Sequence, residues 1–319
     1  MSTDLKEIEF EILAEEKRKL SKVTHVIHSA ANTSYYAKDE EICSTNVEGT
    51  KNFYSFMVEN APNLQKFVHV SSAFACGVEN SGKASKQLME SEYPTFDTIS
   101  KGNHFYPYTL SKAKCELVLT QLAKVTKSSD KLVIVRPSII VGNTQTGCLP
   151  SGSIFFAFRV INALKAIAWP FSYKIDVVPV DWTADAIAHL TKKSLSHSVY
   201  HLSSGEFASD WTQISEAFSK SPGGCFKCSS ASRDATEKYI LVSLEELRKK
   251  NDRWPKCFPA SVRYMINLYS KYAMLNVTFN NQRIIAEGIL PPEPFHNYIP
   301  QCMSFPADLC VKQQLEEDF

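Results

Sequence analysis

The chain has 319 residues, of which 44% are hydrophobic, so it is long enough for one large domain or two modest ones. Its 35 basic and 34 acidic residues give a formal net charge of +1, which gives no reason to expect nucleic acid or a charged membrane surface as a partner. No apolar run reaches the length of a transmembrane segment, and no secretory leader is visible. The nine scattered cysteines then favour reduced thiols and a cytoplasmic setting.

Strand and helix patterns alternate from the start of the chain. Spaced apolar residues predict an amphipathic helix over residues 4–20. Val23–His28 is a short apolar run that predicts a buried parallel strand, and Asp39–Val58 predicts a helix. The next strand is expected at Leu64–Ser71. The polar stretch from Glu79 to His104 follows it and is interpreted as a surface loop.

The later elements continue this alternation. A helix is expected at Tyr108–Lys124, a strand at Leu132–Val135 and a linker leading out of the sheet at Asn143–Gly152. They are followed by a buried helix at Ile154–Trp169, a further helix at Thr183–Leu190 and a further strand at Val199–Leu202. A monotopic membrane contact at Ile154–Trp169 is the alternative to a buried helix. After residue 207 the pattern is helical and irregular. This order predicts an α/β fold with a doubly wound parallel sheet.

The stretch Tyr106-Pro107-Tyr108-Thr109-Leu110-Ser111-Lys112 carries the clearest chemical signal. Pro107 suits the first turn of a helix, which places Tyr108 and Lys112 four residues apart on one face. A free phenol titrates near pH ~10, and a nearby ammonium lowers that pKa toward a value useful for proton transfer. The alternative is an amphipathic helix on which the two side chains have no chemical role.

Three other stretches occur in an order that resembles the extended short-chain dehydrogenase/reductases. His28-Ser29-Ala30-Ala31-Asn32, followed by Thr45-Asn46-Val47-Glu48-Gly49-Thr50, is similar to the adenine side of the cofactor site. Phe67-Val68-His69-Val70-Ser71-Ser72-Ala73 is similar to the strand that ends in the catalytic hydroxyl. Val135-Arg136-Pro137-Ser138 is similar to the turn that covers the nicotinamide. The resemblance covers residues 20–206 well.

The resemblance implies a role for each matching residue. Tyr108 would exchange the proton at the substrate carbonyl oxygen, and Lys112 would bind the nicotinamide ribose and lower the Tyr108 pKa. Ser72, rather than its competitor Ser71, would hydrogen-bond the reacting oxygen. Ser138 would contact the carboxamide, although a plain turn at the strand end is an alternative. Ala30 and Ala31 would let the adenine half of NADP, or of NAD, approach the strand end, while His28 is expected to pack and Asn46 to form helix-side hydrogen bonds.

The sequence departs from that family before Gly49, its first glycine. The glycine-rich turn that binds the pyrophosphate is missing from the pattern, as are about two βα units. Val23–His28 would then be an open sheet edge, which invites pairing with another chain or self-association. Two explanations are a truncated gene product, which is favoured because the catalytic positions carry usable residues, and a degraded relative.

The family pattern places a partial NAD(P)-binding domain at residues 1–142, to which residues 181–206 return, and a smaller, mostly helical substrate-binding region at residues 143–319. Asp176-Val177-Val178-Pro179-Val180-Asp181-Trp182 is among the stretches that resemble fatty acyl-CoA and carrier-protein thioester reductases, the group of the male-sterility type. The expected activity is therefore reduction of an acyl thioester, bound to CoA or to an acyl carrier protein, to an aldehyde or alcohol. A sugar-nucleotide or sterol epimerase or dehydrogenase and a non-catalytic binding protein are the alternatives.

A lone Cys225-Phe226-Lys227-Cys228 motif is the one candidate for metal binding. A structural zinc site needs two further ligands at a recognisable spacing, and the sequence offers no second pair. We therefore expect no metal.

Overall fold

The computed structural model describes residues 14–34, 37–77, 86–90, 99, 104–148, 154–221, 238–249, 254, 258 and 260–304. Its centre is a parallel sheet of four strands, which are, in spatial order, β1 (His25–His28), β2 (Lys66–Val70), β4 (Leu132–Pro137) and β9 (Val199–Leu202). In the registers of this sheet, Val68 pairs with Ile27 on one side and with Val133 on the other. All six residues of β4 are buried, as expected for a strand inside a covered parallel sheet.

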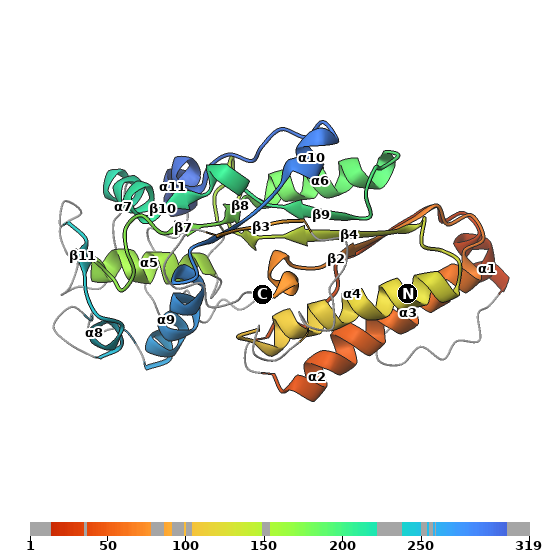
Figure 1. Ribbon diagram of the computed structural model, residues 1–319, viewed down its shortest axis with the longest axis horizontal. Helices are drawn as coiled ribbons and strands as arrows, with labels where there is room; N and C mark the ends of the chain where they lie inside the picture. Colours follow the sequence, from red (N-terminus) through yellow and green to blue (C-terminus); the bar gives the residue numbers. More distant parts are fainter. Residues whose placement is uncertain are drawn as a thin grey trace.

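Helices cover both faces of this sheet (Figure 1). α3 (Thr50–Asn60) and α4 (Pro107–Val125) lie on one face, and α6 (Val180–Lys192) lies on the other. Phe67 packs toward α3 and α4, whereas its neighbour Val68 packs toward α6, because successive side chains of a strand point to opposite faces. The predicted doubly wound α/β fold of the Rossmann type is confirmed.

The helices that precede and follow β2 begin and end close to the predicted positions. The helix expected over Asp39–Val58 runs as α2 (Asp39–Cys43), a π-helical turn (Ser44–Gly49) and α3. α4 begins with Pro107 in its first turn, where the missing N–H costs no hydrogen bond. Of the helix predicted over residues 4–20, the described part is α1 (Ala14–Leu20).

The other elements are short strands paired two by two and the helices around them. They are a 3-10 turn (Ala73–Cys76), β3 (Lys86–Leu88), β5 (Ile139–Ile140), α5 (Ile154–Leu164), β6 (Ala166–Ile167), β7 (Lys174–Ile175), β8 (Val177–Val178), a 3-10 turn (Gly205–Phe207), β10 (Ser209–Asp210), α7 (Trp211–Lys220), β11 (Ile240–Leu241), α8 (Leu244–Arg248), α9 (Ala260–Ala273), β12 (Val277–Phe279), α10 (Gln282–Ala286) and α11 (Phe295–Ser304).

An apolar core separate from the sheet's own lies around α5. Phe155, Phe156 and Ile161 are each less than 5% exposed, so a buried helix is confirmed over Ile154–Leu164. The segment predicted to continue to Trp169 is too long for the helix, since Ala166 and Ile167 form β6. Within the described residues no helix combines the length and apolarity needed to cross a bilayer. β9 follows α6 and pairs with β4 in the central sheet. The division into residues 1–142 with 181–206 and residues 143–319 stays a prediction.

The described parts of one predicted loop and one predicted linker contain structure that the sequence did not indicate. The stretch 79–104 was expected to be a polar loop, but β3 pairs with β12 in parallel, and buried Glu90 accepts hydrogen bonds from the backbone N–H groups of His201 and Arg283. The linker expected from Asn143 is a closed turn, since Asn143 and Gly147 exchange two backbone hydrogen bonds. Gly147 has φ 79° and faces the Gln301 carbonyl so closely that a Cβ there would clash.

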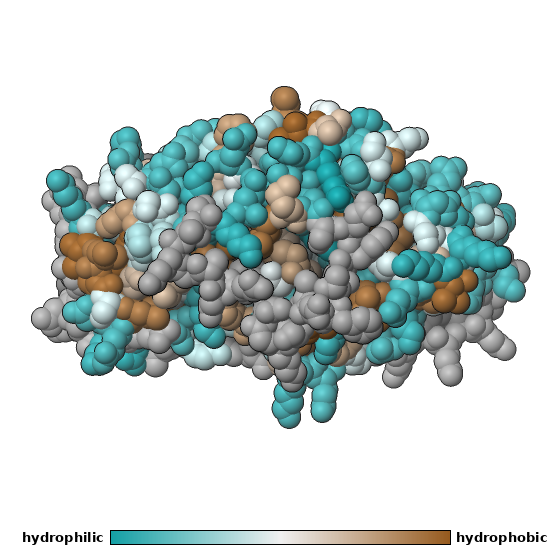
Figure 2. Space-filling model, viewed as in Figure 1, coloured by the Kyte–Doolittle hydropathy of each residue, from teal (hydrophilic) through white to brown (hydrophobic). Residues whose placement is uncertain are grey.

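β1 is less buried than predicted. Val26 and His28 face the core, but the alternate side chains are open, and Ile27 is 49% exposed. Among the described strands only β2 pairs with β1, so β1 lies at the edge of the sheet. Exposed apolar side chains also gather at the opposite end of the molecule, near β11, where Leu241 is 59% exposed (Figure 2).

Candidate active site

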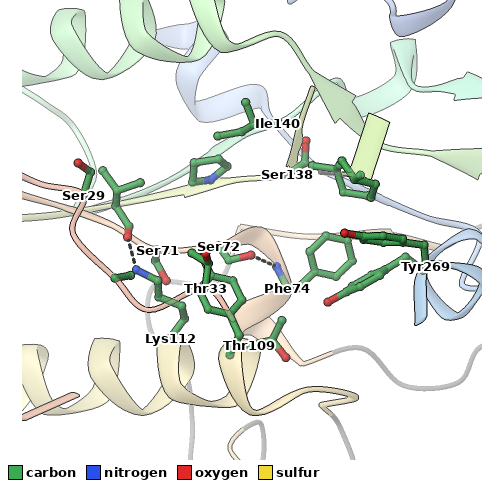
Figure 3. Close-up of a pocket in the computed structure, with 17 residues that line it drawn as sticks. Ser29, Thr33, Ser71, Ser72, Phe74, Thr109, Lys112, Ser138, Ile140 and Tyr269 are labelled. Carbon is green, nitrogen blue, oxygen red and sulfur yellow. Dashed lines mark hydrogen bonds between the residues drawn. The ribbon is translucent and has the colours of Figure 1, made fainter. Parts of the chain in front are cut away.

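A cleft of about 340 Å³ lies at the carboxyl ends of β1, β2 and β4 (Figure 3). Open parallel sheets bind ligands at this edge, where the loops that follow successive strands converge. The predicted residues that line the cleft are Ala31, Ser72, Tyr108, Lys112 and Ser138. Ala30, the sixth, is exposed next to β1 and is not among the lining residues. The structure therefore brings together residues that lie more than 100 positions apart in the sequence.

Tyr108 and Lys112 occupy the first two turns of α4 and both reach the cleft. The Lys112 ammonium nitrogen lies 5.8 Å from the centre of the Tyr108 ring. It donates a hydrogen bond of 2.8 Å to the carbonyl oxygen of Val70, the last residue of β2, as Figure 3 shows. Lys112 therefore crosses from the helix to the end of the strand, at the level of the serines that follow it.

The side chain of Lys112 is almost fully buried, being 3% exposed. Burial lowers the pKa of Lys112 because the charged form loses its hydration, while the Cys115 thiol and the Glu116 carboxylate act in the opposite direction. Burial also raises the pKa of Cys115 to about 12, so this thiol is neutral at physiological pH. Glu116 is therefore the anion that favours the ammonium form of Lys112.

Ser71 and Ser72 both line the cleft, and their hydroxyl groups have different partners. The Ser71 hydroxyl donates a 2.5 Å hydrogen bond to Glu116 and is thus directed into the protein. The Ser72 hydroxyl accepts a longer bond, 3.3 Å, from the backbone N–H of Phe74 at the start of a 3-10 turn. A hydroxyl that accepts this one bond keeps its own proton for another acceptor. This geometry supports the choice of Ser72, although its role stays a prediction.

Ser138 lies across the cleft from these serines (Figure 3). Its backbone N–H donates to the Leu202 carbonyl at 2.9 Å, which fixes the turn between β4 and β5. Its hydroxyl faces buried Asp176, which also accepts the backbone N–H groups of Ser204 and Phe279. Burial raises the pKa of Asp176 to about 6 in spite of these hydrogen bonds. The Asp176 carboxylate thus connects the start of β8 with the ends of β9 and β12, behind the side of the cleft that Ser138 lines.

Sequence reasoning missed the apolar end of the cleft. Phe74, Tyr269 and Tyr272 line it together with isoleucines from β5 and α5. Tyr272 packs edge-on against Phe74, with ring centres 4.8 Å apart, and the Tyr106 hydroxyl donates to the Leu268 carbonyl at 2.6 Å. α9 therefore meets the start of α4 over a sequence separation of about 160 residues, and no local signal in either segment indicates that contact.

Asn46, expected to form helix-side hydrogen bonds, lies in the π-helical turn and is 2% exposed. Its amide oxygen accepts the backbone N–H of Asn32 at 2.7 Å, and its amide nitrogen donates to the Asn32 carbonyl and to the Ser111 hydroxyl, each at 2.9 Å. Ser111 in turn donates to the Tyr108 carbonyl at 2.7 Å. Asn46 therefore joins the loop after β1 to the helix that carries Tyr108.

Replacing Asn46 by Ala is expected to destabilise the protein by about 2–3 kcal/mol, because it removes two hydrogen bonds to the partly buried backbone of Asn32 and one buried hydrogen bond to Ser111. Urea unfolding of the purified variant measures this loss. Asn60→Ala is the matched control, since Asn60 makes one hydrogen bond to its own helix and is only partly buried. Equal stability of the Asn46 and Asn60 variants would contradict the stabilising role of the Asn46 hydrogen bonds.

His28, expected to be a packing residue, is buried under the cleft. Its Nε2 lies 2.9 Å from the Thr50 hydroxyl, and its ring stacks on His69 with centres 5.8 Å apart. Burial, followed by the nearby Lys112 charge, lowers the pKa of His28 to about 4. Burial also lowers the pKa of His69, so both rings are neutral at physiological pH.

This shift makes stability depend on pH. Between the unfolded pKa, about 6.5, and a folded pKa of about 4, the unfolded chain binds more protons than the folded protein, so stability falls as pH falls. His28 alone is expected to contribute a loss of about 2 kcal/mol between pH ~8 and pH ~5. Urea unfolding at both pH values should show a smaller loss in His28→Phe and an unchanged loss in His25→Gln, whose side chain is exposed on the same strand. A wild-type pH dependence in His28→Phe would contradict the assignment.

No group of three metal-binding side chains occurs within the described ranges, and Cys225 and Cys228 lie outside them. The cysteines that are described are free thiols: Cys43, Cys76, Cys115, Cys148 and Cys302.

Comparison with known proteins identifies a family. A family profile described as male sterility protein, an NAD-binding domain, matches residues 1–187, which is more than half of the chain. Fatty acyl-CoA reductase 2 of Mus musculus is 26% identical over 238 residues, covering 64% of this chain and 44% of the mouse protein. The non-canonical nonribosomal peptide synthetase FrzA of Cladobotryum sp is 28% identical over 184 residues, covering 56% of this chain and 17% of the synthetase. The chain thus spans less than half the length of these relatives.

Solved structures share the fold. The terminal R domain from the myxalamid PKS-NRPS biosynthetic pathway superposes with a TM-score of 0.67 at 15% identity, covering 95% of this chain and 73% of that domain. An archaeal thiolation-reductase di-domain gives a TM-score of 0.64 at 18% identity over 95% of this chain and 60% of that one. RMD from Pseudomonas aeruginosa complexed with NADPH gives 0.56 at 17% identity, over 96% of this chain and 86% of RMD.

Proposed function

Because this chain belongs to the male sterility protein family, we propose that it is a reductase that uses NADPH, with NADH as the alternative, to reduce an acyl thioester. One observation carries the proposal. Tyr108, Lys112 and Ser72 line the same cleft at the carboxyl edge of the sheet, although Ser72 comes from a different element. A phenol, an ammonium group and a hydroxyl around one space suit proton transfer to a carbonyl oxygen.

The residues of the cleft suit the nicotinamide and ribose half of the cofactor. Lys112 offers an ammonium group for the ribose hydroxyls, and the backbone turn at Ser138, rather than its buried hydroxyl, is the group proposed to contact the carboxamide. Ala31, at the end of β1, has a side chain small enough to let a ligand approach the backbone. When bound, the nicotinamide supplies the hydride that reduces the carbonyl carbon.

Side chains of the protein would bind and protonate the carbonyl oxygen of the substrate. Ser72 would donate a hydrogen bond to it and fix its position, while Tyr108 would give it a proton as negative charge develops. Lys112, 5.8 Å from the ring of Tyr108, would stabilise the phenolate that remains. The hemithioacetal formed on the substrate would then break its C–S bond and release an aldehyde and a thiol.

The substrate is proposed from the relatives and from the apolar end of the cleft. The matching mouse protein is named a fatty acyl-CoA reductase, and one solved relative is a thiolation-reductase di-domain. Phe74, Tyr269 and Tyr272 would contact the acyl group next to the thioester. An acyl-CoA or an acyl group on a carrier protein is therefore the proposed substrate, and the first product is an aldehyde.

The test uses the purified chain, with a longer gene product in parallel if the coding sequence upstream supplies a glycine-rich turn in frame. NADPH binding is followed by its fluorescence, and turnover by its oxidation with decanoyl-CoA, hexadecanoyl-CoA or an acylated carrier protein. Oxidation with formation of an aldehyde or alcohol, identified by mass spectrometry, supports the proposal. Oxidation of UDP-glucose by NAD without thioester reduction would favour a sugar-nucleotide enzyme, and lack of both binding and turnover would favour a non-catalytic protein.

A further inference from the structure

A buried ion pair lies directly behind the cleft. Glu116 is two helical turns after Tyr108 on α4, and Arg136 comes from β4; both side chains are 0% exposed. The guanidinium holds the carboxylate with three close contacts, Nη2 to Oε2 at 2.6 Å, Nε to Oε1 at 3.0 Å and Nε to Oε2 at 3.2 Å. Such a pair gains little stability over well-packed apolar side chains, because both charges have lost their hydration.

The Ser71 hydroxyl is a third member of this cluster, and apolar side chains in place of the ion pair could not bind it. The Ser71 hydroxyl donates to Glu116 Oε1 at 2.5 Å, and the Ser71 backbone N–H donates to the Val135 carbonyl at 2.8 Å. Ser71 is thus held by its side chain to α4 and by its backbone to β4. Ser72 is the next residue, and Figure 3 shows both serines between Lys112 and Phe74.

We propose that Glu116 and Ser71 are positioning residues, in which the carboxylate held by Arg136 fixes Ser71 and so aligns the Ser72 hydroxyl with Tyr108 and Lys112. This inference rests on the proposed function. Tyr108, Lys112 and Glu116 follow one another at intervals of four on α4, so one helix face carries both the reacting groups and the anchor. A rotation of the Ser71–Ser72 segment would move the Ser72 hydroxyl away from the substrate carbonyl oxygen, which is the proposed hydrogen-bond acceptor of both Ser72 and Tyr108.

The same carboxylate faces Lys112 and favours its ammonium form against the effect of burial. Arg136 lies against the same carboxylate in the buried ion pair, so the two opposite charges balance each other. The anchor therefore serves geometry and charge together, since the ammonium it favours is the group that would stabilise the Tyr108 phenolate.

Ser71→Ala tests the inference because it removes the hydroxyl and leaves the ion pair intact. We expect kcat for decanoyl-CoA reduction to fall by about 10- to 100-fold, as for a reacting group displaced by a fraction of an ångström, with KM and the NADPH Kd within about threefold of wild type. Ser71→Thr, which keeps the hydroxyl, is expected to recover most of the loss. Thr120→Val is the matched control, since Thr120 is buried one turn after Glu116 and its hydroxyl donates only to the Glu116 backbone carbonyl.

Amide hydrogen exchange gives a readout that does not need turnover. Ser71→Ala should speed exchange of residues Ala73–Cys76 by about tenfold or more, because the start of their 3-10 turn loses its anchor, and Thr120→Val should not. Wild-type kcat in Ser71→Ala, with or without faster exchange, overturns the positioning role. If the wild-type protein binds NADPH but reduces no thioester, the proposed function fails, and unchanged exchange in Ser71→Ala then rejects the anchor as well.

Discussion

Tyr108→Phe is expected to lower thioester reduction by roughly 10²–10⁴-fold, the usual contribution of a positioned acid. The change removes one oxygen and keeps the ring, so the contact between Lys112 and the ring face is retained. Affinity for NADPH should stay within about threefold, because the groups proposed to bind the ribose and carboxamide are Lys112 and Ser138. Steady-state kinetics with decanoyl-CoA and fluorescence titration with NADPH measure the two quantities.

Tyr106→Phe is the matched control for this experiment. Tyr106 lies two residues away, and its hydroxyl donates to the Leu268 carbonyl. Its loss is expected to cost stability, by about 1–2 kcal/mol, and to leave the chemical step largely unchanged. Retained turnover in Tyr108→Phe would reject Tyr108 as the acid, and equal losses in both variants would indicate a packing effect of the aromatic end of the cleft.

The different positions of Tyr106 and Tyr108 at the start of α4 illustrate why the centre of the site can be predicted from the sequence. Helix periodicity fixes the relation of Tyr108 to Lys112, and the carboxyl end of a parallel strand fixes the place of Ser72. Both relations are local rules, and the structure places these side chains around one cleft. The sequence pattern already favours Ser72 over Ser71, and the fold adds a physical reason that no local pattern contains, since Glu116 holds the Ser71 hydroxyl.

The remaining features depend on contacts that no local rule encodes. β3 has three residues, two of them polar, and forms only because β12, almost 200 residues later, offers a partner. Tyr269 and Tyr272 belong to a helix that resembles any amphipathic helix until it packs on Phe74. Glu90 reads as a loop residue but is buried because two backbone N–H groups converge on it. Burial of polar residues with distant partners therefore marks the limit of prediction from patterns.

Breaking the ion pair behind the cleft from one side is expected to cause the largest loss of stability. Arg136→Met leaves the Glu116 carboxylate buried with only the Ser71 hydroxyl as a close partner, and a single unpaired buried charge of this kind costs about 3–5 kcal/mol. The double variant Arg136→Met with Glu116→Leu removes both charges and is expected to recover most of that loss, because the space is then filled by apolar groups of similar size.

Urea unfolding of the two single variants and the double variant separates the coupling of the pair from its packing. Glu48→Leu with Lys51→Met is the matched control pair, since these side chains also form an ion pair but are about half exposed, where the interaction contributes less than about 1 kcal/mol. If the single variants unfold like wild type, then a charge left alone at this site does not carry the cost that its burial predicts. If the double variant is as stable as wild type but has lost turnover, the pair is retained for the alignment of Ser72 with Tyr108 and Lys112 rather than for stability. That outcome would connect the buried charge directly to the chemistry in front of it.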